Sequence, residues 1–163
     1  YRAEKINTHG GSLRIYIKKH SKIKIEKSVK SILLEEEKFG IKKYKTYENF
    51  GKSVYKIRDN VRRSILKLKE KNNKIVGYGS PAKATTALNF FGISEEIDCI
   101  VEDNKLKHGK FLPGMRIPIV AKQNLKTKPD IALVLAWNFY EDIKKNNSNL
   151  AKEFTNIKDL EKS

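Results

Sequence analysis

One stretch, residues 73–92, constrains the fold of this chain more than any other. The apolar pair Ile75-Val76 leads into glycines at positions 77 and 79, and a helical stretch opens at Ser80-Pro81. Serine favours the cap of a helix and proline favours its first turn, so the stretch predicts a strand, a tight turn and a helix. Such a turn points unpaired backbone N–H groups and the positive end of a helix at one spot, where a phosphate or another anion can bind.

Glycine spacing in the same turn matches a dinucleotide-binding pattern. Gly77-x-Gly79-x-x-Ala82 has the spacing of G-x-G-x-x-G/A, and the acids Glu102-Asp103 lie about 20 residues further on. A nicotinamide-dinucleotide module is therefore one candidate. The same spacing also suits an ordinary tight turn at the first strand of an α/β sheet, so the pattern alone leaves both interpretations open.

Charge separates the two parts of the chain. The 163 residues carry a formal net charge of +16, and the first 72 of them hold 21 Lys and Arg against 8 Asp and Glu. The basic excess lies outside the turn region, and lysine supplies most of it, whereas arginine is the preferred residue for phosphate and base contacts. We expect no nucleic-acid partner. The basic segment leaves one alternative, a non-catalytic interaction module that binds polyanions with a steep salt dependence.

Cysteine usage and hydropathy limit the setting of the protein. The single cysteine, Cys99, excludes a disulfide within the chain, and we expect no metal site in it. No apolar run approaches the roughly 20 residues that span a bilayer, and the start at Tyr1 lacks a signal-peptide pattern. We expect a cytoplasmic protein without a membrane partner. The start at Tyr1 rather than Met also suggests a piece of a longer protein.

The elements before residue 73 form an accessory part. Residues 13–17 alternate between apolar and polar side chains, which predicts a half-buried strand. No partner strand is evident, so we expect this strand to pair with a second chain, with the later sheet or with a domain outside this chain. Two helices should follow, from about 23 to 39 with Gly40 as the stop, and from a cap at Thr46 to about 71.

From residue 74 onward, strands and helices alternate. The uninterrupted apolar run 131–136 is typical of a strand covered on both faces, as in a parallel sheet. We therefore predict an α/β fold with a small Rossmann-like parallel-sheet domain over 73–163, preceded by a strand segment (1–20) and a connector of two helices (21–72). The expected strands are 74–78, 97–101, 117–120 and 131–137, and the expected helices are 81–91, 140–145 and one from about 150.

Four motifs carry a resemblance to a known family. They are His9-Gly10-Gly11-Ser12-Leu13-Arg14, Gly77-Tyr78-Gly79-Ser80-Pro81-Ala82-Lys83, Leu112-Pro113-Gly114 with Ile117-Pro118-Ile119, and Leu135-Ala136-Trp137-Asn138. In this order they resemble the C-terminal part of S-adenosylmethionine-dependent sugar C-methyltransferases. Members of that family methylate a carbon of a deoxysugar that is carried on a nucleoside diphosphate. A dinucleotide module would leave the first and last motifs unexplained.

The resemblance also implies a domain organisation. A zinc-binding N-terminal domain and a methyltransferase domain that binds S-adenosylmethionine would precede this region. Residues 1–20 would end the sheet of that methyltransferase domain, and residues 73–163 would help to hold the nucleotide-sugar. This chain lacks the zinc cysteines and the cofactor glycine motif, so we expect it to bind neither cofactor and to be inactive alone. The expected partners are the preceding domains of the same polypeptide, with a homodimer as a further possibility.

Methylation of a carbon next to a ketone requires a base that removes a proton from that carbon. His9, at the domain junction that the resemblance implies, is the candidate catalytic residue of this chain. The alternative is a histidine that makes a structural hydrogen bond at a turn. His20 and His108 lie in lysine-rich surroundings and are expected to be exposed.

Candidate substrate-binding residues lie where the predicted strands end, because ligands of parallel sheets bind beyond the carboxyl ends of the strands. For the pyrophosphate, we expect donors from the turn and the charge of its lysine; these residues are Tyr78, Gly79, Ser80, Pro81, Ala82 and Lys83. Trp137 and Asn138 could place a ring and an amide beside the base or sugar. Asp103 could accept hydrogen bonds from sugar hydroxyls. A solvated lysine and a tryptophan that only caps the core are the alternatives.

Overall fold

The computed structural model describes residues 1–19 and 22–162 of the chain. The described residues divide into two compact units, Tyr1–Val54 and Tyr55–Ser163. Helix α2 (Tyr44–Glu70) belongs to both units, since the boundary falls within it. None of the helices in these described ranges is long and apolar enough to cross a membrane.

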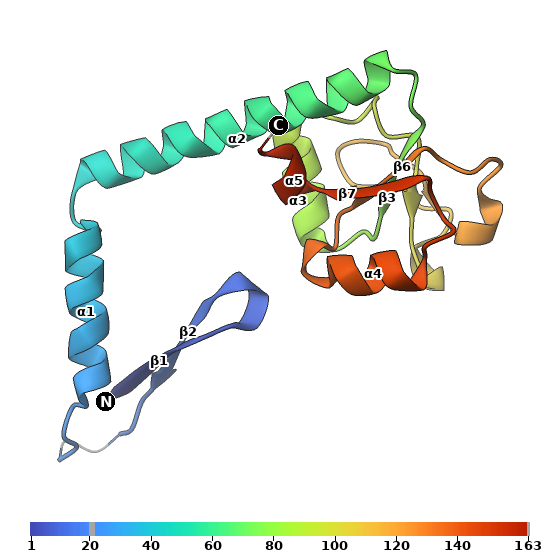
Figure 1. Cartoon of the computed structure of the whole chain (residues 1–163). Helices are drawn as coiled ribbons and strands as arrows, with labels where there is room; N and C mark the ends of the chain where they lie inside the picture. The colour runs from blue at the N-terminus through green and yellow to red at the C-terminus, as the bar shows by residue number, and fades with distance from the viewer. Residues whose placement is uncertain (20–21, 163) are drawn as a thin grey trace. The chain divides into compact units, whose positions relative to one another are not determined.

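The first unit begins with an antiparallel hairpin (Figure 1). Strand β1 (Arg2–Ile6) pairs with β2 (Ser12–Tyr16) through the 3-10 turn η1 (Thr8–Gly10). The expectation that the strand near residue 13 has no partner in this chain was wrong. Strand β1 escaped the sequence pattern because three of its five residues, Arg2, Glu4 and Lys5, are charged, and only Ala3 is buried.

Two helices follow the hairpin. Helix α1 (Lys27–Phe39) lies beside β1 and starts a turn later than expected, but it ends at Gly40 as predicted. Gly40 has a φ of 83°, and its N–H donates to the carbonyl groups of the last helical turn. Helix α2 begins at Tyr44, and Thr46 does not cap it, since the Thr46 hydroxyl donates to the Gly40 carbonyl over 2.8 Å.

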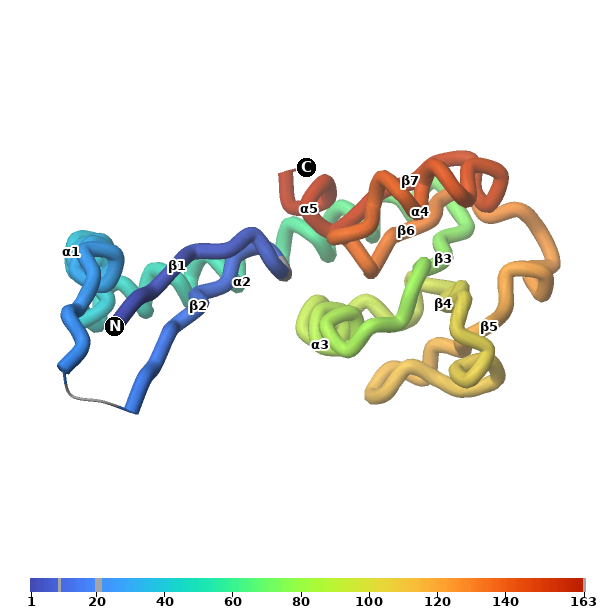
Figure 2. Tube along the Cα trace, turned by 90° about the horizontal axis from the view of Figure 1, so that it is seen from below, coloured from blue at the N-terminus to red at the C-terminus, as the bar shows by residue number. Residues whose placement is uncertain are grey.

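The second unit is built on a parallel five-stranded sheet, which confirms the predicted Rossmann-like α/β fold. The strands are β3 (Ile75–Tyr78), β4 (Ile100–Val101), β5 (Ile119–Val120), β6 (Ile131–Val134) and β7 (Glu153–Asn156). Their order is β5-β4-β3-β6-β7, which Figure 2 shows from one edge of the sheet to the other. The chain therefore builds one side of the sheet from β3 outward and then returns to the other side of β3.

Several predicted elements are shorter or of another type. Strand β4 covers only the end of the expected 97–101, although hydrogen bonds such as that from the Gly77 N–H to the Cys99 carbonyl (2.9 Å) keep the earlier part beside β3. Strand β6 ends at Val134 rather than at 137. The helix expected from about 150 was wrong, because β7 comes first and the helix α5 (Ile157–Leu160) follows it.

Helices cover both faces of the sheet. Helices α2, α3 (Ala82–Phe91) and α5 pack on one core cluster, which includes Leu88 and Leu133. Helix α4 (Tyr140–Asn146) packs on the second cluster, which includes Val76 and Tyr78. The 3-10 turns η2 (Lys105–Lys107), η3 (Lys122–Asn124) and η4 (Trp137–Phe139) complete the connections.

Candidate functional site

The strand order creates a switch point between β3 and β6. The chain leaves these two neighbouring strands in opposite directions, and in sheets of this kind ligands bind beyond the carboxyl ends of the strands at such a point. The turn after β3 and the segment after β6 meet at this point. Gly79 has a φ of 84°, and a Cβ atom there would lie 3.3 Å from the Ala136 Cβ atom. Glycine is therefore suited to this position both by its backbone conformation and by the close approach of the segment after β6.

Gly77, the first glycine of the pattern, is a packing residue. A Cβ atom at this position would lie 2.4 Å from Cδ1 of Ile100 and 2.9 Å from Cδ1 of Leu135. Both of those side chains are fully buried. The absence of a side chain at Gly77 thus lets the side chains of Ile100 and Leu135 pack closely against β3.

Lys83 and Trp137 join the two predicted binding motifs. The Lys83 Nζ atom lies 4.2 Å from the centroid of the Trp137 ring, within the range of a cation–π interaction. Lys83 stands in the first turn of α3, and Trp137 opens η4 after β6. Trp137 also packs partly against the core, so it caps the core and contacts the lysine at once. Asn138 follows it and is exposed.

The start of α3 differs by one residue from the prediction. Pro81, in an extended conformation, takes the cap position that was expected for Ser80, and the helix begins at Ala82. The Ala84 N–H donates back to the Pro81 carbonyl over 2.9 Å. Helix geometry leaves the N–H groups of Ala82 and Lys83 without an intrahelical acceptor, so these two groups are the donors that the helix start offers to an anion.

The carboxylate of Glu102, the residue directly after β4, binds the middle of the turn. One Glu102 oxygen accepts the Ser80 backbone N–H (2.8 Å) and the Ser80 hydroxyl. The Lys107 ammonium bridges this carboxylate (3.3 Å) and the Ser80 carbonyl (2.9 Å). The other Glu102 oxygen accepts the Asn104 N–H over 3.1 Å. The Ser80 N–H, one of the predicted anion donors, is thus engaged by the protein itself.

Glu102 is held in its ionised form. Burial raises its pKa, but hydrogen bonds from Ser80 and from the Asn104 backbone, together with the charge of Lys107, outweigh burial and lower the pKa to about 2. Only 12% of the side chain is exposed. His108, which was expected at the surface, is half-buried, and its Nε2 atom lies 2.7 Å from the Glu102 carbonyl oxygen. The loop after β4 is therefore tied to the turn after β3.

Tyr78 and Asp103 form a separate pair. The Tyr78 side chain is only 3% exposed, because it packs in the core cluster beneath α4. Its hydroxyl donates to the Asp103 carboxylate at 2.8 and 3.0 Å. Burial, followed by the bond to Asp103, raises the pKa of Tyr78 to about 12. Asp103 itself is exposed, so it keeps the capacity to accept further hydrogen bonds at this edge of the sheet.

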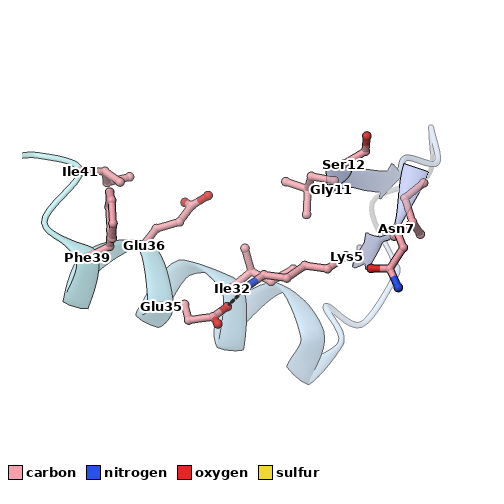
Figure 3. Close-up of a pocket in the computed structure, with 11 residues that line it drawn as sticks. Lys5, Asn7, Gly11, Ser12, Ile32, Glu35, Glu36, Phe39 and Ile41 are labelled. Atoms are coloured by element: carbon pink, nitrogen blue, oxygen red, sulfur yellow. Dashed lines mark ion pairs between the residues drawn. The ribbon is translucent and has the colours of Figure 1, made fainter. Parts of the chain in front are cut away.

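The candidate base, His9, belongs to the first unit. Its backbone lies in η1 at the tip of the hairpin, but its side chain is outside what the structure describes. The neighbouring residues Asn7 and Ser12 line a groove of about 570 Å³ between the hairpin and α1 (Figure 3). An ion pair between Lys5 and Glu35 (2.6 Å) crosses this groove. All predicted substrate-binding residues, in contrast, belong to the second unit.

Residues suited to a metal do not gather in the described part of the chain, where no group of three or more His, Cys, Asp or Glu side chains could hold an ion. The groups that the switch point presents are backbone N–H groups, the Lys83 ammonium and the Trp137 ring.

The second unit is a Rossmann-like domain in which the start of α3 follows β3 and η4 follows the neighbouring strand β6. Residues 7–157 match the family described as the C-methyltransferase C-terminal domain, and the chain belongs to this family. All four motifs singled out in the sequence lie within the matched residues, so the family resemblance drawn from them is confirmed.

A characterised relative supports the same assignment. C-methyltransferase NovU of Streptomyces niveus is 32% identical to this chain over 140 residues, which are 84% of this chain and 33% of that protein. The chain thus spans about a third of the length of this relative.

Sequence patterns missed the bonds that Glu102 makes to Ser80 and Lys107. The sequence marks Glu102 by its distance from the glycines and by its place at a predicted strand end, but not its contacts, and Lys107 is one lysine among many in a basic chain. The position of Glu102 directly after β4 was the signal that could have found it, because β4 and β3 are adjacent and end at the same edge.

Proposed function

We propose that this chain is the nucleotide-sugar-binding C-terminal part of an S-adenosylmethionine-dependent C-methyltransferase that acts, in the cytoplasm, on a deoxysugar linked to a nucleoside diphosphate. Membership of the C-methyltransferase C-terminal domain family supports the enzyme class. The arrangement at the switch point supports a role in substrate binding.

One observation carries the proposal: the Lys83 ammonium lies 4.2 Å from the Trp137 ring, at the junction of the two strand ends. A diphosphate next to Lys83 would also reach the N–H groups of Ala82 and Lys83 at the positive end of α3. A base or sugar could then stack on Trp137, with the Asn138 amide and the Asp103 carboxylate as further hydrogen-bonding groups.

The chemistry divides between this chain and the preceding domains. S-adenosylmethionine supplies the methyl group and would be held by a domain ahead of this one, where zinc would also be bound. His9 is the base in this proposal: it takes a proton from the carbon next to the ketone of the sugar, so that this carbon can attack the methyl group. The 163-residue chain alone would bind the substrate without turning it over.

Calorimetric titration of the chain with dTDP, UDP and NAD, each at two salt concentrations, tests the binding role. We expect saturable binding of one nucleoside diphosphate. Lys83→Met should weaken this binding about tenfold or more, since a charge-assisted contact to phosphate is lost.

Lys144→Met is the matched control, because Lys144 also lies over an aromatic ring, that of Tyr140 (5.8 Å), but on α4. It should leave the affinity unchanged. Equal losses in the two variants would show that only the net charge matters, which is the behaviour of a basic interaction module. A preference for NAD would contradict the proposed substrate class.

A further inference from the structure

The turn between β3 and α3 is closed by three side chains that belong to separate segments. Glu102 accepts the Ser80 N–H and hydroxyl, and Lys107 spans the Ser80 carbonyl and the Glu102 carboxylate. We call Ser80, Glu102 and Lys107 the turn clamp. Its carboxylate is largely buried and makes four hydrogen bonds, so it holds the turn in one conformation.

A dinucleotide would need hydrogen-bonding groups of this turn that the turn clamp already engages. In dinucleotide-binding sheets, the pyrophosphate approaches the backbone between the second and third small residues of the pattern, and a free acid after the second strand binds the ribose hydroxyls. Here the two intervening residues are Ser80, whose N–H is given to Glu102, and Pro81, which has no N–H. Of the two acids near the ribose position, Glu102 directly follows β4 and has both oxygens engaged, and the next residue, Asp103, accepts the Tyr78 hydroxyl.

The clamp also places a negative charge where that pyrophosphate would lie. A phosphate next to Ser80 would be repelled by the Glu102 carboxylate. It would also find no N–H donor there, because the Ser80 N–H already donates to Glu102. The donors that remain are those of Ala82 and Lys83, on the side of the turn that meets β6 and Trp137.

From these contacts we infer that Glu102 is a specificity-determining positioning residue: by clamping Ser80 it rejects dinucleotides and leaves the start of α3 and Lys83 to a nucleoside diphosphate. The ligand half of this inference rests on the proposed function. Glu102 acts through Ser80 and Lys107 and does not itself contact the ligand.

Amide NMR of the ¹⁵N-labelled chain tests the clamp first without any ligand. Glu102→Gln should lower the hydrogen-exchange protection of the Ser80 amide about tenfold, since a hydrogen bond to a charged acceptor is replaced by one to a neutral acceptor. Glu95→Gln, which removes the same charge from an exposed loop residue, should leave it unchanged. Equal protection of Ser80 in both variants would overturn the clamp.

Titration of the same samples with dTDP and NAD tests the selection. In the unaltered chain, dTDP should shift the amides of Ala82 and Lys83 while the Ser80 amide stays protected, and dTDP should bind at least tenfold more tightly than NAD. Glu102→Gln should narrow this ratio about tenfold, and Glu95→Gln should preserve it. A loss of protein stability alone would weaken the binding of both dTDP and NAD and would leave the ratio of their affinities unchanged.

Two results would overturn the role of Glu102 in selecting the nucleotide while leaving the proposed function intact. One is a ratio of dTDP to NAD affinity that Glu102→Gln does not change. The other is a dTDP-induced chemical-shift change that is larger for the Ser80 amide than for the amides of Ala82 and Lys83. No shift of any turn amide with either nucleotide would overturn the proposed function and the selection with it. If Glu102→Gln does not fold, Ser80→Ala removes only the hydroxyl contact of the clamp, and it should narrow the ratio in the same direction by a smaller factor.

Discussion

The two units of this chain differ in how completely their apolar side chains are buried. In the second unit, strands β3 and β6 are buried along their whole length, and two core clusters fill the faces of the sheet. In the first unit, Ala3 is the only apolar side chain that is buried among the described residues. Large apolar side chains there are exposed, including Ile15 (61%) and Phe39 (73%).

This difference shows that similar amphipathic patterns need not produce similar cores. The alternation in β2 and the periodicity of α1 suit a buried face, but a two-stranded hairpin and a helix have too few layers to cover each other. The second unit has strands with helices on both sides, so the same kinds of side chain become fully buried. The second unit should therefore set the stability of the chain.

Truncation of a leucine in each unit should give the largest contrast. Leu133→Ala, at a fully buried position of β6, should lower the free energy of unfolding by about 2–5 kcal/mol, because it removes buried methyl groups and leaves a cavity. Leu34→Ala on α1, where the side chain is 58% exposed, should change it by less than about 0.5 kcal/mol. Urea unfolding followed by circular dichroism measures both. Similar losses would mean that the first unit is packed as tightly as the second.

Adding one methyl group should change the free energy of unfolding in opposite directions in the two units. Gly77→Ala should destabilise the chain by about 1–3 kcal/mol, because its Cβ atom would overlap buried methyl groups of Ile100 and Leu135. Gly51→Ala lies within α2 and has nothing within 4 Å of the new Cβ atom, so it should stabilise the helix by up to about 1 kcal/mol. The same urea measurement applies. A stabilising Gly77→Ala would show that Ile100 and Leu135 can move at no cost.

Acid should weaken the second unit through Glu102. Its folded-state pKa of about 2 lies below the ordinary value of 4.5, so its contribution is fully present above about pH 4.5 and is lost as the pH falls toward 2. We expect a loss on the order of 2 kcal/mol, less than the full shift would give, because water still reaches the carboxylate. Thermal melting between pH 2 and 7 records it. Glu102→Gln should flatten this part of the profile, and an unchanged acid dependence would contradict the assignment.

The smallest effect should come from the ion pair of the first unit. Lys5 and Glu35 are 2.6 Å apart, but both side chains are more than half exposed. Solvent and salt weaken such a pair, so Glu35→Gln should leave the urea midpoint unchanged within error. A clear drop in the midpoint would show that this contact organises the groove between the hairpin and α1.

Much of the second unit could be predicted because its sequence is locally consistent. The apolar runs of β3 and β6, the glycine turn and the start of α3 all indicate the same fold. Strand β7 could not be predicted in this way, because it lies at the edge of the sheet and three of its four residues, Glu153, Thr155 and Asn156, are polar. The partner of β2 was missed for a similar reason.

The sequence could predict where in the fold the candidate site lies, but not which side chains contact each other there. Lys83 and Trp137 each follow the carboxyl end of a predicted strand. Because parallel strands end at the same edge of a sheet, the sequence could indicate that these two residues lie close together. The clamp on Ser80 depends on the direction of the Glu102 and Lys107 side chains, which no spacing rule specifies. The catalytic role of His9 and the substrate-binding roles of all the other candidate residues, Lys83 and Trp137 included, stay predictions.

The fluorescence of Trp137 gives the most direct test of substrate binding at the switch point, because this is the single tryptophan of the chain. Titration with a dTDP- or UDP-linked deoxysugar should change its emission in a saturable way, and Lys83→Met should raise the half-saturating concentration about tenfold. Heat of binding in the calorimeter without any change in Trp137 emission would place the ligand elsewhere and contradict the assignment of this site.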